Sequence, residues 1–317
     1  NQFTSLDLSN NTALIALHCM NNQLTALDVT ANTALTGLYI GGGSQSQIST
    51  VDLSNNTALI SLNTQDILTL TSLDVSNNTA LTDLGCWNNS LATLNVNGAS
   101  SLTYLHCNNN QLTNLDVSNN TALTSLNCYS NQLTSLDLSA NTDLTYLHSD
   151  GNPLTSLDVS ANTSLTILSC NNNQLTNLDV SNNTALTGLW CDSNQLTNLD
   201  LSANTALTQL DLAGNQLTYL NMKNGVTSAY TGFRVTNNSL TCIETLDPDY
   251  ATANWTLANE NIDAGVTFDV ICGAEARTHW YVATTGSDNS GSGTLASPLA
   301  TIQTAINATT NGDTVSV

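Results

Sequence analysis

A 21-residue repeat limits what this chain can fold into more than any other feature of its sequence. Cys86, Cys107 and Cys128 are spaced 21 residues apart, and Cys170 and Cys191 keep the same interval. Three longer intervals come from the insertion GGGSQSQI and from one or two extra residues in two other coils. The repeat can be followed through eleven equivalent positions: Cys19, Ile40, Thr64, Cys86, Cys107, Cys128, Ser149, Cys170, Cys191, Leu212 and Val235.

Each repeat holds two half-units of the form LxxLxLxxN, such as LTNLDVSNN at residues 112–120 and LTSLNCYSN at residues 123–131. Apolar residues alternate around each Leu-x-Leu or Leu-x-Cys, which is the side-chain period of a strand. The asparagine that closes each half-unit suits a turn, so stacked coils predict asparagine ladders. One coil of 21 residues buries six apolar side chains, and burying each stabilises the coil by roughly 1.5–3 kcal/mol. That gain cannot offset the loss of backbone entropy, which costs about 1–2 kcal/mol for each ordered residue. The coils must therefore stack, at about 4.8 Å, into a mainly β solenoid.

Repeats such as LTSLDVSNNTALTDLGCWNNS resemble the leucine-rich repeats of internalin-type bacterial surface proteins, in particular the 21-residue class with a cysteine ladder. The resemblance covers residues 1–240 and implies a leucine-rich-repeat solenoid with little helix. Members of that family use the solenoid for adhesion and for recognition of different partners. The chain opens in the middle of a repeat, so we expect it to be a segment of a longer or processed protein whose export signal lies upstream.

Two further segments follow the repeats. Residues 241–278 look like the C-terminal cap that closes such solenoids in exported proteins of Bacteroidetes type. Residues 279–317 are similar to the truncated beginning of a right-handed parallel β-helix domain, whose remaining coils would lie outside this chain. In that tail, Ser297 suits a helix N-cap and Pro298 the first helical position, and Leu299, Ile302 and Ile306 form one apolar stripe.

The eight cysteines fall into two groups. Six occupy inward repeat positions where Ile, Leu and Val also occur, so we interpret them as small apolar core residues. Disulfides between adjacent coils are conceivable, although they would distort the strands, and single thiols one coil apart lack the spacing of a metal site. Cys242 and Cys272 flank the cap, where a disulfide would seal the last coil of an exported protein. The alternative is two more buried thiols.

Aromatic and histidine residues gather at the outward positions of the variable half-unit, whereas the half-unit LTxLDVSxNT is nearly constant. Stacked coils would align them on one sheet, which we expect to be the concave recognition sheet, with Trp87, Tyr104, Tyr146 and Trp190 as the best anchors. The alternative is that aromatic pairs only favour sheet packing. The candidate ligand-binding residues are Tyr39, Trp87, Tyr104, His106, Tyr129, Tyr146, His148 and Trp190.

The constant half-units place an acidic row on the other side of the solenoid, which we expect to be a second sheet. Neighbouring carboxylates about 5 Å apart in water repel by roughly 0.8 kcal/mol. Hydrogen bonds to Thr, Ser and backbone groups of adjacent coils are the simpler way to offset that repulsion. Calcium is the alternative, because carboxylates are hard oxygen ligands. It would bind along Asp116, Asp137, Asp158 and Asp179.

The charge of the chain argues against some classes of binding partner. Lys223, Arg234 and Arg277 are its basic side chains, against 24 acidic ones, for a net charge of −21. That field repels phosphate backbones and anionic lipid, so we expect no nucleic-acid partner and no membrane insertion. We expect no catalysis, because the carboxylates lie along an open ladder rather than in a closed pocket, and no cofactor.

Three hypotheses remain from the sequence. The first is a secreted or cell-surface bacterial recognition or adhesion module, a monomer that binds a protein or glycan through the aromatic sheet. The second is a passive spacer. The third is a glycan-capturing accessory to a polysaccharide-degrading β-helix enzyme downstream, an idea that depends on fold analogy alone.

Overall fold

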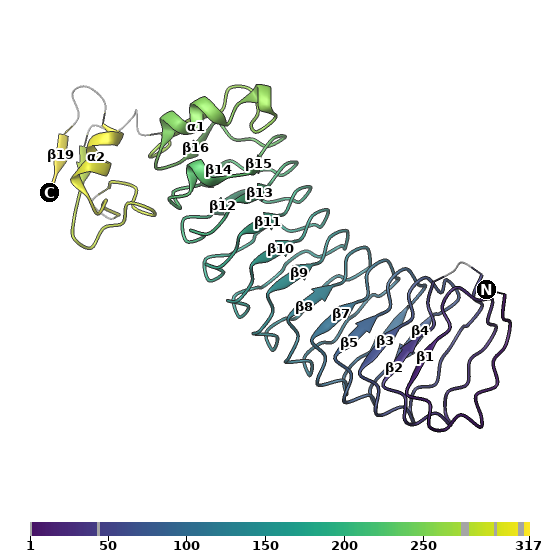
Figure 1. The fold of residues 1–317 in the computed structure, drawn as a ribbon. Helices are drawn as coiled ribbons and strands as arrows, with labels where there is room; N and C mark the ends of the chain where they lie inside the picture. Colours follow the sequence, from purple (N-terminus) through teal and green to yellow (C-terminus); the bar gives the residue numbers. More distant parts are fainter. Residues whose placement is uncertain (1, 43–44, 274–278, 295–296, 310–313) are drawn as a thin grey trace. The chain divides into compact units, whose positions relative to one another are not determined.

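The computed structural model describes residues 2–42, 45–273, 279–294, 297–309 and 314–317. It divides into two compact units, residues 1–174 and residues 175–317. Figure 1 shows that each consists largely of stacked coils, which carry short strands. None of the helices among the described residues is long and apolar enough to cross a lipid bilayer.

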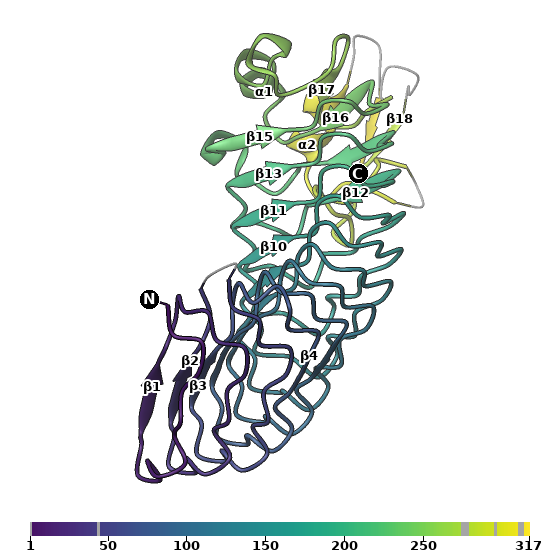
Figure 2. The ribbon, with the colours of Figure 1, turned by 90° about the vertical axis from the view of Figure 1, so that its right-hand side faces the viewer.

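In the first unit, one parallel sheet is built from the variable half-units. Each coil contributes a three-residue strand, and the central leucines of neighbouring strands lie side by side, as Leu105 does beside Leu126. Figure 2 shows the first of these strands, β1, β2 and β3, in consecutive coils. The strands are β1 (Ala16–His18), β2 (Gly37–Tyr39), β3 (Ser61–Asn63), β5 (Asp83–Gly85), β7 (Tyr104–His106), β8 (Ser125–Asn127), β9 (Tyr146–His148) and β10 (Ile167–Ser169).

Leucines and thiols fill the interior, which confirms the predicted inward positions. All eleven equivalent positions of the repeat are buried, and Cys86, Cys107 and Cys128 are completely inaccessible. Burial raises the pKa of Cys86 and of Cys128 to about 12, since the thiolate would lose its hydration. The six ladder cysteines are free thiols.

Asparagine ladders hold the turns, as the sequence predicted. The amide of Asn110 donates to the carbonyls of Cys107 in its own coil and Cys86 in the preceding one, both at 2.9 Å. Its side-chain oxygen accepts from the backbone N–H of Leu91 at 3.0 Å. Asn131 repeats the pattern one coil later. These bonds satisfy backbone groups that the short strands leave unpaired.

The acidic side differs from the second sheet that the sequence led us to expect. In the first unit only β4 (Ser72–Asp74) and β6 (Thr93–Asn95) pair there among the described residues, and the other coils pass through turns. From adjacent coils, the amides of Asn95 and Asn97 contact Asp74 and Asp116, but the prediction places the Ser, Thr and backbone donors in the wrong coil. Asp137 instead accepts from the backbone N–H of Ser139 in its own coil at 2.9 Å, and the other aspartates of the row repeat this turn.

The second unit continues the same coil pattern in two parallel sheets. One contains β11 (Gly188–Trp190), β13 (Gln209–Asp211) and β15 (Gly232–Arg234). The other contains β12 (Asn198–Asp200), β14 (Tyr219–Asn221), β16 (Cys242–Glu244) and β17 (Thr267–Asp269). The short 3₁₀ helices η1 (Thr227–Ala229) and η2 (Leu257–Asn259) lie in the connections.

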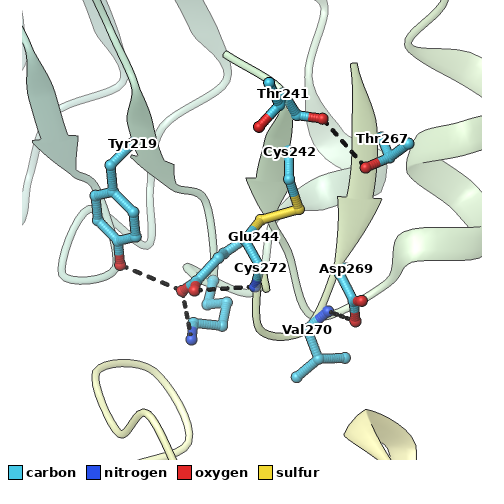
Figure 3. Close-up of a disulfide and its surroundings, with 9 residues drawn as sticks. Tyr219, Thr241, Cys242, Glu244, Thr267, Asp269, Val270 and Cys272 are labelled. Atoms are coloured by element: carbon cyan, nitrogen blue, oxygen red, sulfur yellow. Dashed lines mark hydrogen bonds and ion pairs between the residues drawn. A yellow bond between two sulfur atoms is a disulfide. The ribbon is translucent and has the colours of Figure 1, made fainter. Parts of the chain in front are cut away.

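One helix lies between β16 and β17, in the segment that the sequence predicts to be the cap. The helix α1 (Pro248–Asn254) begins at Asp247, whose carboxylate accepts from the backbone N–H of Tyr250. Trp255 after the helix stacks on Phe233 with ring centroids 3.9 Å apart. Beside this cluster, a disulfide joins Cys242 and Cys272, with Cα atoms 5.7 Å apart, as Figure 3 shows. Aromatic packing and one covalent link therefore cover the last coil.

A buried ion pair lies next to the disulfide. Lys223 is 1% exposed, and its Nζ is 2.8 Å from Oε2 of Glu244. Tyr219 donates its hydroxyl to the same oxygen, and the backbone N–H of Cys272 donates to Oε1, both at 3.2 Å (Figure 3). Burial and the Glu244 charge raise the pKa of Tyr219. Glu244 thus connects β14, β16 and the segment after β17.

The tail contains β18 (His279–Tyr281), α2 (Ile302–Ala308) and β19 (Thr314–Ser316), with β18 and β19 paired in parallel. The predicted N-cap at Ser297 is wrong. The N-cap lies four residues later, at Thr301, which accepts from the backbone N–H of Thr304. Leu299 makes a β-bridge with Val282 instead of joining an apolar helix stripe. The assignment of this tail to a parallel β-helix stays a prediction.

Candidate functional site

A hollow of about 260 Å³ opens on the variable sheet of the first unit. It spans the four neighbouring strands β2, β3, β5 and β7, and four of the eight predicted ligand-binding residues line it. Those four are Tyr39, Trp87, Tyr104 and His106. The repeat thus brings together residues that lie up to 67 positions apart in the sequence.

Differences in side-chain size create the hollow. Tyr39 on β2 and His106 on β7 occupy the same outward position of the repeat, and the strands between them carry Asn63 and Gly85 there. The other outward position of each strand holds Ser61 on β3, Asp83 on β5 and Tyr104 on β7. Small residues on β3 and β5 therefore leave a depression between aromatic residues on β2 and β7.

The Trp87 ring takes its position because residue 85 is glycine. A Cβ atom placed on Gly85 would lie 2.5 Å from Cζ3 of Trp87, so the indole occupies the space of the missing side chain. On the far side, the indole approaches His106 with ring centroids 6.1 Å apart and planes tilted by 60°. The indole thus forms one wall of the hollow and is half-buried there.

The largely apolar hollow contains one carboxylate inside its aromatic border. Asp83 lines it, and the hydroxyl of Thr82 donates to Oδ2 of that carboxylate at 2.5 Å. Burial lowers the pKa of His106, although the nearby charge of Asp83 opposes the shift. The imidazole is therefore neutral at neutral pH, and Asp83 supplies the formal charge of the hollow.

Three further predicted residues form a second group on β8 and β9. The Tyr129 and His148 rings lie 4.6 Å apart, and Tyr146 meets His148 edge-on at 6.4 Å. Asp150 contacts Nε2 of His148 at 2.9 Å and accepts from the hydroxyl of Ser169 at 2.7 Å. Burial and then the Asp150 charge raise the pKa of Tyr146. Internal contacts thus tie these side chains to one another, outside the hollow.

Trp190 lies in the second unit, on β11. It occupies the outward position of its strand, beside Asp211 of β13, and Asp211 is paired with Arg234 of β15 at 2.8 Å from Nε. Trp190 is half-buried. Its surroundings therefore differ from those of Trp87, and its role as an anchor stays a prediction.

Sequence reasoning missed the residues that shape the hollow. Asn63, Asp83 and Gly85 are polar or small, so a search for aromatic anchors passed over them. The signal was present in the repeat, because two consecutive coils carry small residues at both outward positions. His18, in the same register as the aromatic stripe, stacks on Tyr39 with ring centroids 4.3 Å apart.

The structure holds no cluster of three or more His, Cys, Asp or Glu side chains suited to a metal ion within the residues it describes. On the acidic side, hydrogen bonds from Ser139 lower the pKa of Asp137, while Asp116 and Asp158 oppose the shift. The hydrogen bonds in these turns offset part of the repulsion between neighbouring carboxylates. Calcium binding along Asp116, Asp137, Asp158 and Asp179 stays a prediction.

Comparison with known proteins places the chain among leucine-rich-repeat solenoids. No family model and no curated protein matches it significantly. Among solved structures, the functional domain of InlJ from Listeria monocytogenes, which includes a cysteine ladder, is 31% identical, with a TM-score of 0.66. That alignment covers 93% of this chain and 73% of InlJ. The internalin InlF from the same species is 25% identical over 76% of this chain and 73% of its own, with a TM-score of 0.51.

A third structure shares the fold alone. The plant peptide hormone receptor RGFR1, solved in complex with RGF2, is 16% identical. It aligns over 81% of this chain and 52% of its own, with a TM-score of 0.58.

Proposed function

Because this chain belongs to the internalin-like leucine-rich-repeat proteins with a cysteine ladder, we propose that it is an extracellular recognition module that binds a protein partner through the hollow of its first unit. The observation that carries the proposal is the hollow itself. Its border consists of large residues at variable positions, in a chain whose other half-unit is nearly constant. Aromatic residues beside small polar ones are typical of protein-binding surfaces.

The disulfide supports an extracellular location. Bonds such as Cys242–Cys272 persist in oxidising compartments, and this one lies next to the buried pair of Lys223 and Glu244 where the last coil meets its cap. The RGFR1 complex is an example of peptide recognition by a solenoid of this fold. Both points favour recognition outside the cell.

Recognition fits the hydrogen bonding better than catalysis does. His148, Asp150 and Ser169 lie together, but the Ser169 hydroxyl donates to Asp150 at 2.7 Å. In a nucleophilic triad the serine donates to the histidine that takes up its proton, whereas here the serine donates directly to a carboxylate that also contacts His148 and the backbone N–H of Asn171. We interpret this network as support for the sheet surface.

Binding assays with point variants test the proposal. The chain is presented to a panel of extracellular proteins and to a glycan array, and dissociation constants are measured for wild type and Trp87→Ala. Removing a central aromatic anchor costs about 2 kcal/mol or more, so binding of a protein partner is expected to weaken at least about 30-fold. Phe3→Ala, which removes an exposed aromatic side chain of the same unit outside the hollow, serves as the matched control.

The outcomes separate the candidate functions. Unchanged binding by Trp87→Ala would show that the partner does not bind in the hollow. Binding to the glycan array alone would support the glycan-binding alternative, which Asn63 and Asp83 beside an aromatic wall also suit. Wild-type protein that binds neither panel would favour the spacer.

A further inference from the structure

We propose that the hollow on strands β2, β3, β5 and β7 receives an organic cation, the side chain of an arginine or lysine on the protein partner. The proposal rests on the proposed function and specifies its chemistry. Three observations carry it: the aromatic walls, the single carboxylate in the hollow and the distribution of charge in the first unit.

The walls have the composition of a cation-binding site. Tyr39, Trp87 and Tyr104 line one depression. The faces of aromatic rings carry partial negative charge, and a cation within about 6 Å of a ring centroid is attracted to it. Indole attracts cations more strongly than the phenol ring of tyrosine does. Gly85 leaves the space that lets the Trp87 ring lie against the strand.

The charge inside the hollow has the complementary sign. Asp83 lines it, and His106 adds no positive charge at neutral pH because burial lowers its pKa. A guanidinium that enters between the rings would meet a carboxylate, and such charge-assisted hydrogen bonds are about twice as strong as neutral ones. An anionic group would meet only repulsion.

The surrounding field also attracts cations. The three basic residues of the chain, at positions 223, 234 and 277, all lie beyond residue 174. The sequence of the first unit therefore contains aspartate but neither lysine nor arginine. Such a surface steers basic partners toward it and repels acidic ones.

The size of the hollow favours one side chain over a larger ligand. Sites that enclose whole small molecules measure about 300–1,000 Å³. At about 260 Å³ this depression lies just below that range, which suits a single long side chain presented by a protein. An oligosaccharide would extend over the sheet beyond the hollow.

Amide-capped amino acids test the inference without knowledge of the partner. N-acetyl-arginine amide and N-acetyl-lysine amide are titrated into ¹⁵N-labelled protein at 0.15 M salt, and the indole N–H signal of Trp87, assigned by its loss in Trp87→Phe, is followed. N-acetyl-citrulline amide, which has nearly the shape of the arginine probe without its charge, is the ligand control. We expect the arginine probe to bind about tenfold more tightly than the citrulline probe.

Matched variants separate the hollow from general attraction to a negative surface. Asp83→Asn is expected to weaken binding of the arginine probe about tenfold, whereas Asp143→Asn, the same charge change at an exposed turn outside the hollow, leaves it within about twofold. Gly85→Ala displaces the indole without removing any aromatic ring and is expected to weaken binding similarly. Circular dichroism checks that each variant is folded.

Equal binding of the arginine and citrulline probes, or equal effects of Asp83→Asn and Asp143→Asn, would overturn the inference. Its failure is distinguishable from failure of the proposed function. If a protein partner is lost in Trp87→Ala but bound normally by Asp83→Asn, recognition stands and the cation is rejected. If the probes bind but no extracellular protein does, the cation site stands and the proposed function is rejected.

Discussion

At the scale of single residues, the acidic row is built from one local turn repeated in successive coils. The carboxylate of Asp116 accepts from the backbone N–H of Ser118 at 3.0 Å and from its hydroxyl at 2.7 Å. Both hydrogen bonds stabilise the ionised carboxylate, so they lower the pKa of Asp116. The shift in each coil therefore links stability to pH.

We expect acid to destabilise the first unit. The pKa values of the row are lowered in the folded chain, so the unfolded chain binds more protons as the pH falls through about 4. The stabilisation is fully present above that range and is lost below it. The midpoint of urea unfolding is expected to be flat between pH 7 and 5 and to fall toward pH 3. The residues with lowered pKa are Asp7, Asp28, Asp52, Asp74, Asp116, Asp137 and Asp158.

An amide at the same positions provides the control. Asn95 already replaces aspartate in this register, and its side-chain oxygen accepts from the backbone N–H of Asn97 at 3.2 Å. A chain with Asp116→Asn, Asp137→Asn and Asp158→Asn should therefore keep its turns and lose stability less steeply in acid. An unchanged slope would show that other groups control the acid transition.

The sequence predicted which residues line the candidate site better than it predicted the site's shape. Tyr39, Trp87, Tyr104 and His106 were identified from their positions in the repeat, and they do share one hollow. The depression depends on where the Trp87 indole packs, which Gly85 decides through contact rather than through any periodicity. The same pattern gave no reason to separate Tyr129, Tyr146 and His148 from the hollow.

At the scale of elements, two of the strand pairs on the acidic side place an amide next to a carboxylate. In the first unit β4 pairs with β6, and in the second β12 pairs with β14; each pair places an aspartate beside an asparagine. Two adjacent aspartates would repel, and an amide removes that repulsion and supplies a donor. The sequence showed the amides at Asn95 and Asn221, but it did not show which coils pair as strands.

The cap depends on the buried pair of Lys223 and Glu244, and breaking it is expected to be costly. Lys223→Met leaves a buried carboxylate without its counter-ion, which costs about 3–5 kcal/mol. Removing both charges with Lys223→Met and Glu244→Gln should recover most of that loss, since Gln can still accept from Cys272. Unfolding is followed through the fluorescence of Trp255, which packs in the cap.

The exposed pair of Arg234 and Asp211 is the matched control for that experiment. The Arg234 side chain is 50% exposed, so Arg234→Met is expected to cost less than about 1 kcal/mol. Equal losses from Lys223→Met and Arg234→Met would contradict a special role for the buried pair.

Helix α2 illustrates why local signals misplace an element. Ser297 and Pro298 match the preferences of a helix start, yet Leu299 pairs with Val282 and is fully buried. Because that bridge keeps the backbone extended at Leu299, the helix begins only after Thr301, which caps it. A contact with a residue 17 positions earlier outweighed a local preference that is worth about 1 kcal/mol.

At the scale of the whole molecule, repetition made the fold predictable. One interval of 21 residues fixed which side chains point inward, and Cys107 or Leu126 could be placed without any knowledge of distant contacts. Each coil contacts mainly its neighbours, so local periodicity and tertiary packing carry the same information. The cap lacks that periodicity, and its ion pair was not predicted.

Removal of one full repeat should therefore be tolerated. Deleting residues 108–128 joins Cys107 to Tyr129 and keeps every later residue in register, so the chain is expected to fold cooperatively, with a urea m-value lower by about 7%. Deleting residues 108–118 exchanges the two half-units and should abolish that transition. Circular dichroism with urea titration measures both. Similar behaviour of the two chains would contradict a register set by whole coils.

The burial of Lys223 has a practical consequence for handling the protein. It is the first basic residue of the chain, so a protease that cuts after lysine or arginine has no target within the first 222 residues and reaches position 223 only after unfolding. The folded coils should survive trypsin, and a digest analysed by mass spectrometry would leave most of the chain as one very large peptide. Reagents that label lysine amines would likewise leave the recognition surface untouched.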